Sequence, residues 1–201
     1  MTVLFLGHSP AFRGLIRCVD EDRNLVLDLR GRKTGAFDHL YAQYSERVWR
    51  FLARLSGAGA EDLFQETWFA AARHVHRIRE DTQLLPWLFA IARNKHRNSL
   101  RGWARQVRST QELRAQHLDS TVPLDDQVHA LREAGRTSAA FARLPEAHRE
   151  VLLLCVVEGF DTATVARTLA CSEAAIRKRL SRARRELARL CGRQDLAGGD
   201  P

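Results

Sequence analysis

Basic side chains recur at helical spacing close to the C-terminal end of this chain. They are Lys178, Arg182, Arg185 and Arg189. Positions three or four residues apart share one face of an α-helix, so these cations would form a continuous stripe. Guanidinium and ammonium groups bind phosphate oxygens, and the arginine fork also matches the edge of guanine. The stripe therefore favours a polyanionic partner, with DNA as the leading candidate.

The same segment carries an apolar stripe, about 200° around the helix axis from the basic one. Its members are Ile176, Leu180, Ala183, Leu187 and Leu190. One face can pack on a small helical core while the other meets solvent or a partner. With the turn that precedes it, this segment predicts a helix-turn-helix from Glu158 to Leu190.

Two capping residues and a tight turn are expected within this helix-turn-helix. Asp161 can cap the first helix and Ser172 the second, because each side chain can accept backbone N–H bonds. The turn would hold Ala170 or Cys171 in a left-handed conformation, which costs alanine about 1 kcal/mol. The residues expected to face inward are Val165, Ala166, Leu169, Ile176 and Leu180.

The recognition helix of such a unit places its N-terminal part against base edges in the major groove. The predicted DNA contacts are Ser172, Arg177, Lys178, Ser181, Arg182, Arg184 and Arg185. The alternative is a solvated basic helix in a bundle. The two separate stripes and the paired caps argue against that alternative.

The composition restricts the class of protein to which this chain can belong. The chain has 201 residues, 45% of them hydrophobic, and a formal net charge of +8, which suits contact with nucleic acid or an anionic surface. Its four cysteines are far apart and lack metal-ligand spacing, which is typical of reduced thiols. No run approaches the roughly 20 apolar residues of a membrane span, and no signal-peptide core is found. These features predict a soluble cytoplasmic protein.

Helical periodicity dominates the rest of the chain and predicts an all-α fold. Expected helices cover 37–55, 60–77 and 86–101 in the first half, and 125–144 and 145–157 in the second. The expected organisation is two small helical domains, 37–103 and 138–192, joined by a flexible linker, 104–137. The tail 193–201 is expected to be disordered.

Residues 1–36 stand apart as an unassigned N-terminal extension. Asn24 to Leu29 alternates like a short strand, and Gly31 to Gly35 is a basic link rich in breaker residues. A small hairpin, a disordered arm and an artefact of the chosen start codon all remain open for this segment.

An acidic face is expected on the helix 60–77, within an otherwise basic protein. Asp62, Gln65, Glu66 and Phe69 share this face, whereas Phe64, Trp68, Ala71 and Val75 form the core stripe. Such a face repels DNA and suits a basic protein partner, with Phe69 as an anchor. An ordinary solvated face is the alternative.

Several of these segments resemble bacterial sigma factors of the sigma-70 family. Residues 62–68 (DLFQETW) resemble the D-L-x-Q-E-x-F/W signature of region 2, and residues 86–94 (PWLFAIARN) resemble the stretch that follows it. Leu144-Pro145 with Arg149-Glu150-Val151 resembles the opening of region 4, and residues 158–160, 165–166 and 177–184 match the remainder. The presence of regions 2 and 4 alone is similar to the extracytoplasmic function (ECF) subgroup.

The resemblance implies functions for particular residues. In this family the region 2 face docks on core RNA polymerase, a role carried over here to Asp62, Leu63, Gln65, Glu66 and Phe69. Capture of the −10 promoter element falls to Asp81, Thr82, Gln83, Arg93, Asn94, Arg97 and Arg101. The helix-turn-helix residues from Ser172 to Arg185 would bind the −35 element. The implied partners are core RNA polymerase, promoter DNA and an anti-sigma factor.

Some features depart from this pattern or favour other functions. Leu85 stands where the family often has a basic residue, and Ala170 where glycine is usual, which affects promoter specificity rather than membership. A stand-alone helix-turn-helix regulator and a protein-interaction module are the alternative functions. No phosphate loop, nucleophile or catalytic carboxylate pair is found, so no enzyme, cofactor, metal or small-molecule substrate is expected. His74 and His76 point to different helix faces, which argues against a shared metal.

Overall fold

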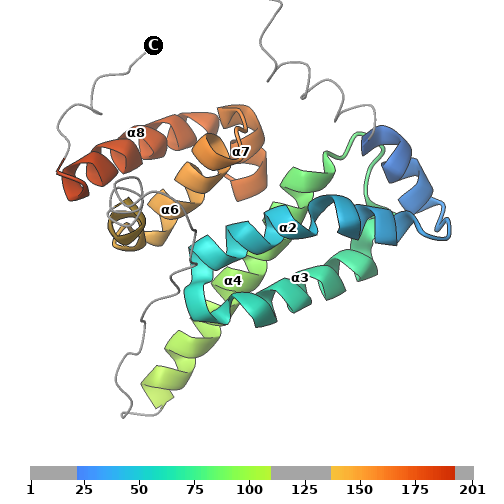
Figure 1. Ribbon diagram of the computed structural model, residues 1–201, viewed down its shortest axis with the longest axis horizontal. Coiled ribbons are helices and arrows are strands. Elements are labelled where there is room, and N and C mark those ends of the chain that lie inside the picture. The colour runs from blue at the N-terminus through green and yellow to red at the C-terminus, as the bar shows by residue number, and fades with distance from the viewer. Residues whose placement is uncertain (1–21, 110–136, 193–201) are drawn as a thin grey trace, which may run out of the picture.

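The computed structural model describes residues 22–109 and 137–192. The described residues form helices and turns, with no strand among them. Residues 22–109 make an N-terminal module and residues 137–192 a C-terminal module, and the two pack against each other (Figure 1). No helix within these ranges is both long enough and apolar enough to cross a membrane.

The N-terminal module is built around α2 (Ala36–Ser56), α3 (Ala60–His74) and α4 (Leu84–Ser109), which pack on one another. Helical spacing places one apolar stripe of α2 in the core, namely Leu40, Tyr44, Val48, Phe51, Leu52 and Leu55. The helix ends where expected, because Gly57 adopts a left-handed φ of 61°. One short 3-10 turn, η1 (Gly57–Gly59), leads into α3, and another, η2 (Val75–Arg77), follows it.

Residues 22–30 form a helix, so the strand-like alternation of Asn24–Leu29 does not produce a strand, and the hairpin reading of this stretch is wrong. Leu25, Val26 and Leu29 are all buried in the core of the N-terminal module. Their spacing of one and four residues is helical, and burial against α2 outweighs the local alternation of apolar and polar residues.

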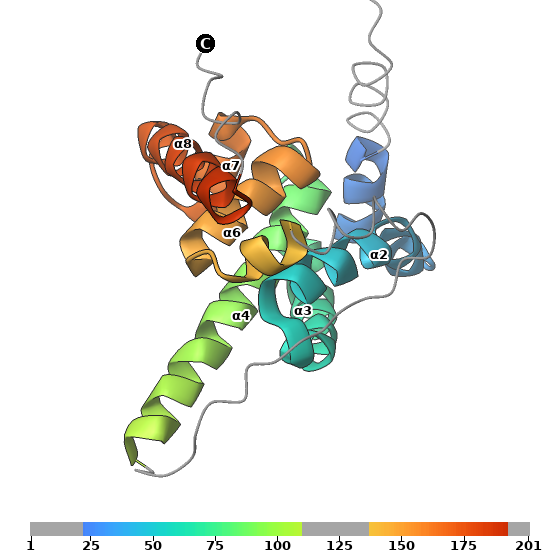
Figure 2. The same ribbon diagram turned by 60° about the vertical axis from the view of Figure 1, so that its left-hand side comes forward.

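The helix α4 is longer at both ends than the predicted 86–101. It begins at Leu84, and Pro86 lies in its first turn, where the missing N–H costs no hydrogen bond. It continues to Ser109, through the first residues assigned to the linker, and its far end projects from the molecule (Figure 2). The rest of the predicted linker, the helix start near residue 125 and the tail 193–201 lie outside the described residues.

The C-terminal module contains a helix at 137–142, then α6 (Glu146–Leu152), α7 (Thr162–Leu169) and α8 (Glu173–Leu190). Pro145 precedes α6 as expected, but the predicted single helix to Val157 changes to a π-helical turn, η3 (Leu153–Val157). The helix α8 packs along both α6 and α7. Fully buried residues at the centre of this packing are Val151, Leu154, Val165, Ile176 and Ala183.

Candidate nucleic-acid interface

Both predicted caps fix the helix-turn-helix. The Asp161 carboxylate accepts a hydrogen bond from the Thr164 N–H at 2.6 Å, and the Ser172 hydroxyl accepts one from the Ala175 N–H at 3.2 Å. The bond from Thr164 is also the main reason that the pKa of Asp161 lies below its ordinary value. Ala170 has φ and ψ of 52°, the left-handed conformation expected for the turn. The first helix of the motif is therefore α7 and the second α8.

The solvent face of α8 is basic along its length. Its exposed polar and charged residues are Ser172 at the N-terminal cap and then Arg177, Lys178, Ser181, Arg182, Arg184, Arg185 and Arg189. Glu173 orients the start of this face, because it accepts a bond from Thr162 at 2.7 Å and pairs with Arg177 at 2.6 Å. Farther along, Arg189 pairs with Glu186. Within residues 137–192 no carboxylate pairs with Lys178, Arg182, Arg184 or Arg185. The structure thus brings together the basic residues that the spacing predicted.

Four of the five residues of α3 assigned to polymerase docking are exposed. Asp62, Gln65 and Glu66 lie on this face, and the Phe69 side chain is 71% exposed. Glu66 forms an ion pair with Lys95 of α4 at 3.2 Å. Leu63 differs from the others, because its side chain is only 6% exposed and packs in the core. Leu63 therefore supports this face from below and takes no part in its surface.

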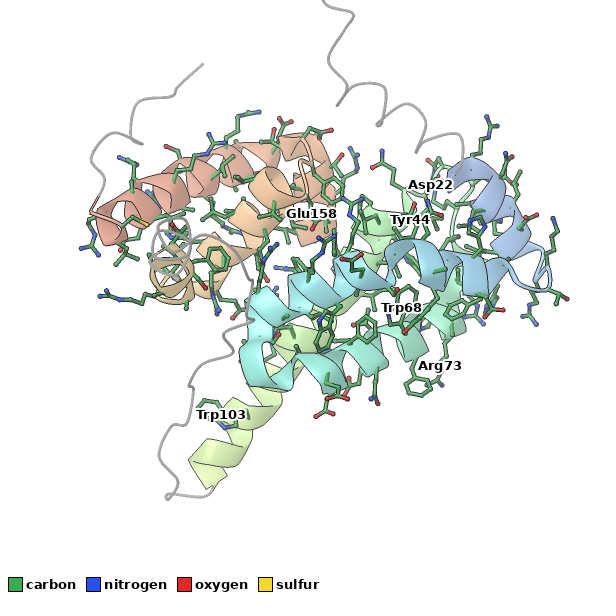
Figure 3. All side chains as sticks on the ribbon, in the orientation of Figure 1. Asp22, Tyr44, Trp68, Arg73, Trp103 and Glu158 are labelled. Atoms are coloured by element: carbon green, nitrogen blue, oxygen red, sulfur yellow. The ribbon has the colours of Figure 1, made fainter. Side chains whose placement is uncertain are left out.

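Behind this face lies a cluster of aromatic rings between α2 and α3. Trp68 is buried there (Figure 3), with the Tyr41 ring centroid 4.7 Å and the Phe37 centroid 6.0 Å away. Trp49 packs edge-on against Phe64 at 5.5 Å. These contacts hold α3 at a fixed rotation, so the acidic face is presented rigidly.

The loop between η2 and α4 holds Asp81, Thr82 and Gln83. Asp81 and Gln83 are exposed, Thr82 is half-buried, and Asp81 pairs with Arg79 at 3.0 Å. The Thr82 N–H donates to the Arg79 carbonyl at 3.1 Å, which closes a tight turn. This loop is compact, and the Asp81 and Gln83 side chains are exposed on it.

Helix 22–30 contacts both ends of this loop. The sequence alone did not predict this role for the helix. Arg30 pairs with Glu80 at 2.6 Å, and Asp22 accepts the backbone N–H of Leu84 at 3.4 Å. Asp22 also accepts a hydrogen bond from the Tyr44 hydroxyl, and Figure 3 shows these two side chains meeting. The helical spacing of the buried leucines in this segment was the available signal.

The predicted DNA residues of α4 do not share one open surface. Asn94 and Arg101 are exposed and Arg97 is half-buried, but Arg93 is only 8% exposed. Its guanidinium donates to the Glu150 carboxylate of α6 at 2.9 Å, with the Glu150 side chain 3% exposed. Desolvation raises the pKa of Glu150, and the charge of Arg93 opposes that rise. Arg93 is therefore an interface residue between the modules here.

Further contacts join the two modules around this pair. Arg47 of α2 binds Glu158 at 2.7 Å, and Arg149 of α6 donates to the Leu55 carbonyl at 3.0 Å. Figure 3 shows Glu158 at the edge of the C-terminal module, facing α2. The ring centroids of Phe89 and Phe160 lie 5.9 Å apart across the same contact. The modules are thus held by buried charge as well as by apolar packing.

The described histidine, cysteine and acidic side chains form no metal site, and the described thiols are free. Within 22–109 and 137–192, no three histidine, cysteine or acidic side chains are grouped so as to hold a metal ion. Cys155, Cys171 and Cys191 carry free thiols, and Cys171 packs against the core at the turn of the helix-turn-helix. Packing accounts for the position of Cys171.

The fold and the open basic face of α8 define a two-module helical protein with a DNA-binding type of helix-turn-helix. Family models agree with this class: sigma-70 region 2 matches residues 40–106, and sigma-70 region 4 matches residues 135–187. Among curated proteins, the RNA polymerase sigma factor CarQ of Myxococcus xanthus is 34% identical over 167 residues. That alignment covers 80% of this chain and 92% of CarQ. The chain belongs to the sigma-70 family, within its ECF group of RNA polymerase sigma factors.

Two further comparisons support this placement. The ECF sigma factor SigM of Bacillus subtilis is 28% identical, over 78% of this chain and 95% of SigM. A solved structure of the sigma factor RpoE in complex with the anti-sigma factor NepR, from Bartonella quintana, matches with a TM-score of 0.65. It is 27% identical to this chain, over 79% of this chain and 98% of RpoE. The similarity thus extends over both modules.

Proposed function

We propose that this chain binds core RNA polymerase and directs transcription initiation by recognising −10 and −35 promoter elements. The observation that carries the proposal is the presence, in one chain, of two exposed surfaces of opposite charge. One is the exposed acidic face of α3 with Phe69 at its end, and the other is the basic face of α8. A stand-alone DNA-binding regulator would need only the second.

In this proposal the acidic face docks on the polymerase. Asp62, Gln65 and Glu66 supply charge and hydrogen bonds, and Phe69 supplies an apolar anchor of the kind that dominates binding energy at interfaces. Leu63 contributes by holding α3 in place from the core. Because the aromatic cluster fixes the helix, little ordering is needed on binding.

The two DNA contacts are assigned to different modules. The face of α8 from Ser172 to Arg185 would bind the −35 element in the major groove. Asp81, Thr82 and Gln83, on the exposed loop before α4, would hold an unpaired −10 base by its polar edges. Asn94, Arg97 and Arg101 would bind the adjoining phosphates.

Arg93 can join that −10 surface only after the two modules part. Its guanidinium is paired with Glu150 in the described arrangement and is closed off from DNA. We therefore infer that polymerase or promoter binding separates α6 from α4. An anti-sigma factor is a further proposed partner, since the similar RpoE was solved in complex with one.

The test is a pull-down with purified core polymerase followed by run-off transcription on genomic fragments. Replacing Asp62 and Glu66 by lysine should abolish co-purification and transcript formation. Glu46→Lys is the matched control, because Glu46 is an exposed acid on α2, away from the α3 face. Polymerase binding that survives both α3 substitutions would refute the docking assignment. DNA binding without any polymerase binding by the wild-type chain would favour a stand-alone regulator.

A further inference from the structure

A second basic feature lies in the N-terminal module, far from α8. An open cavity of about 420 Å³ is found between the turn after residues 22–30, the start of α2 and the end of α3. Its apolar floor includes Phe37 and Val75. In Figures 1 and 2 this turn lies at the end of the module opposite to α6–α8, so the C-terminal module leaves the cavity uncovered.

The rim of the cavity is cationic. Arg32 and Lys33 approach from the turn, and Arg73 and His76 from α3 and η2, while none of the lining residues carries a carboxylate. Lys33 pairs with Asp28 at 3.1 Å. Arg32 and Arg73 form no ion pair with any of the described residues. Two arginines therefore line the cavity without a carboxylate partner among the described residues.

Arg32 has an unusual backbone conformation, and the pKa of His76 reflects the positive charge around it. Arg32 has a left-handed φ of 54°, an uncommon conformation for a non-glycine residue that is often found at functional sites. The pKa of His76 is lowered by its partial burial and by the positive charges of Arg32, Arg77 and His74. A neutral imidazole can stack on a base and still hydrogen-bond, and an anion would relieve the repulsion around it.

The cavity also borders the proposed −10 loop. The loop follows directly in the chain after η2, which contributes His76. Arg30, two residues before Arg32, pairs with Glu80 of that loop. A strand held by the loop would therefore pass close to the cationic rim.

We propose that this cavity binds a nucleotide of single-stranded promoter DNA, next to the base held by the −10 loop. Arg32 and Arg73 bind its phosphates, and Phe37 and His76 provide a surface on which its base can stack. Guanidinium groups beside an aromatic surface are the usual composition of a single-strand site. An acidic protein segment would use the cations but not the apolar floor. The proposal rests on the function proposed above, because that function supplies the unpaired strand.

The experiment measures binding of a short fluorescein-labelled oligodeoxythymidine to the full chain by fluorescence anisotropy, over a series of salt concentrations. Arg32→Ala and Arg73→Ala should each bind several-fold more weakly. Each should also flatten the plot of log affinity against log salt by about 0.7, the value for one lost phosphate contact on a single strand. Arg54→Ala is the matched control, because Arg54 is exposed at the other end of α2. Equal affinities for the control and both variants would overturn the proposal.

Two further measurements distinguish single-stranded DNA from other anionic ligands of the cavity. Thymidine monophosphate should compete far less well than the oligonucleotide, and equal competition would assign the cavity to free nucleotides instead. Core polymerase should bind Arg32→Ala and Arg73→Ala as well as it binds wild type. Weaker polymerase binding with unchanged oligonucleotide binding would show that the cavity takes an acidic protein surface, against the proposal.

Photocrosslinking gives a readout that does not depend on variants. An oligonucleotide with 4-thiothymidine should crosslink to peptides that contain Phe37 or His76, and crosslinks confined to α8 would contradict the site. A wild-type chain that yields no promoter-specific transcript would refute the proposed function. Oligonucleotide binding that depends on Arg32 and Arg73 would still establish the cavity as a single-strand site.

Discussion

The two modules present their charged helices differently. On α8 the proposed −35 residues from Arg177 to Arg185 all lie in solvent, and the caps that orient the helix come from its own neighbourhood. On α4, Arg93 is covered by α6 while Arg101 remains open. A binding face that depends on one motif can thus be complete in the free protein. A face that another module covers is available only after a rearrangement.

Removing the Glu150 carboxylate should have the largest effect. Glu150→Ala leaves the Arg93 guanidinium in the interface without its partner, and breaking a buried pair from one side costs about 3–5 kcal/mol. We expect a loss of that order in the free energy of unfolding in urea. We also expect a larger Stokes radius in size-exclusion chromatography as the modules separate.

The exposed pair of Glu46 and Arg50, with 3.8 Å between its charged atoms, supplies the control for that experiment. Glu46→Ala should change the free energy of unfolding by less than about 1 kcal/mol and leave the Stokes radius as in wild type. If Glu150→Ala behaved like Glu46→Ala, the buried pair would not hold the modules together.

Arg182→Ala tests the exposed basic face of α8 directly and should have the next largest effect. If Arg182 reads a base, −35 binding should weaken by about 1–3 kcal/mol on the preferred sequence and much less on others. If it binds a phosphate, affinity should fall uniformly and the salt dependence should become shallower. Both outcomes are measured by anisotropy with duplex DNA. Unchanged affinity on every duplex would remove Arg182 from the interface.

The contrast between a face formed by one local motif and a face covered by another module also explains what the sequence could predict. The rotation of α8, the caps at Asp161 and Ser172 and the left-handed Ala170 depend on residues within a few positions of one another, and the structure confirms them. Arg93 was assigned to the −10 DNA on the family resemblance. Its pairing with Glu150 could not be predicted, because the two residues lie 57 positions apart in the sequence and no local pattern connects them.

Segments with short or ambiguous patterns account for the other differences. Helix 22–30 is too short for its periodicity to exclude a strand, and its helical state depends on burial against α2. The helix α4 continues beyond Arg101 to Ser109 through polar residues, whose composition suggested a linker although their helix propensity is adequate. Element type was predictable where the apolar stripe was long, whereas element ends were predictable only where a capping residue or a glycine marks them.

Asp161→Ala should destabilise the C-terminal module by about 0.5–2 kcal/mol, because the Thr164 N–H loses its cap. The pKa of Asp161 is lowered in the fold, so its carboxylate stabilises the module above the ordinary aspartate range. That contribution is lost as the pH falls through the lowered pKa. Asp161→Asn should keep the cap but remove this pH dependence. Acid unfolding curves that are identical for wild type and Asp161→Asn would contradict the assignment.

The smallest effect is expected where helix 22–30 meets the −10 loop. Arg30→Ala removes an exposed ion pair with Glu80, so the free energy of unfolding should fall by at most about 1 kcal/mol. The effect should be local, because the loop then keeps fewer contacts to the module and opens more often. Amide hydrogen exchange at Thr82 should therefore accelerate in Arg30→Ala, while Arg50→Ala, which breaks an exposed pair on α2, should leave it unchanged. Equal exchange at Thr82 in both variants would mean that Arg30 does not restrain the loop, and would leave Asp22, which accepts the Leu84 N–H, as the contact from helix 22–30.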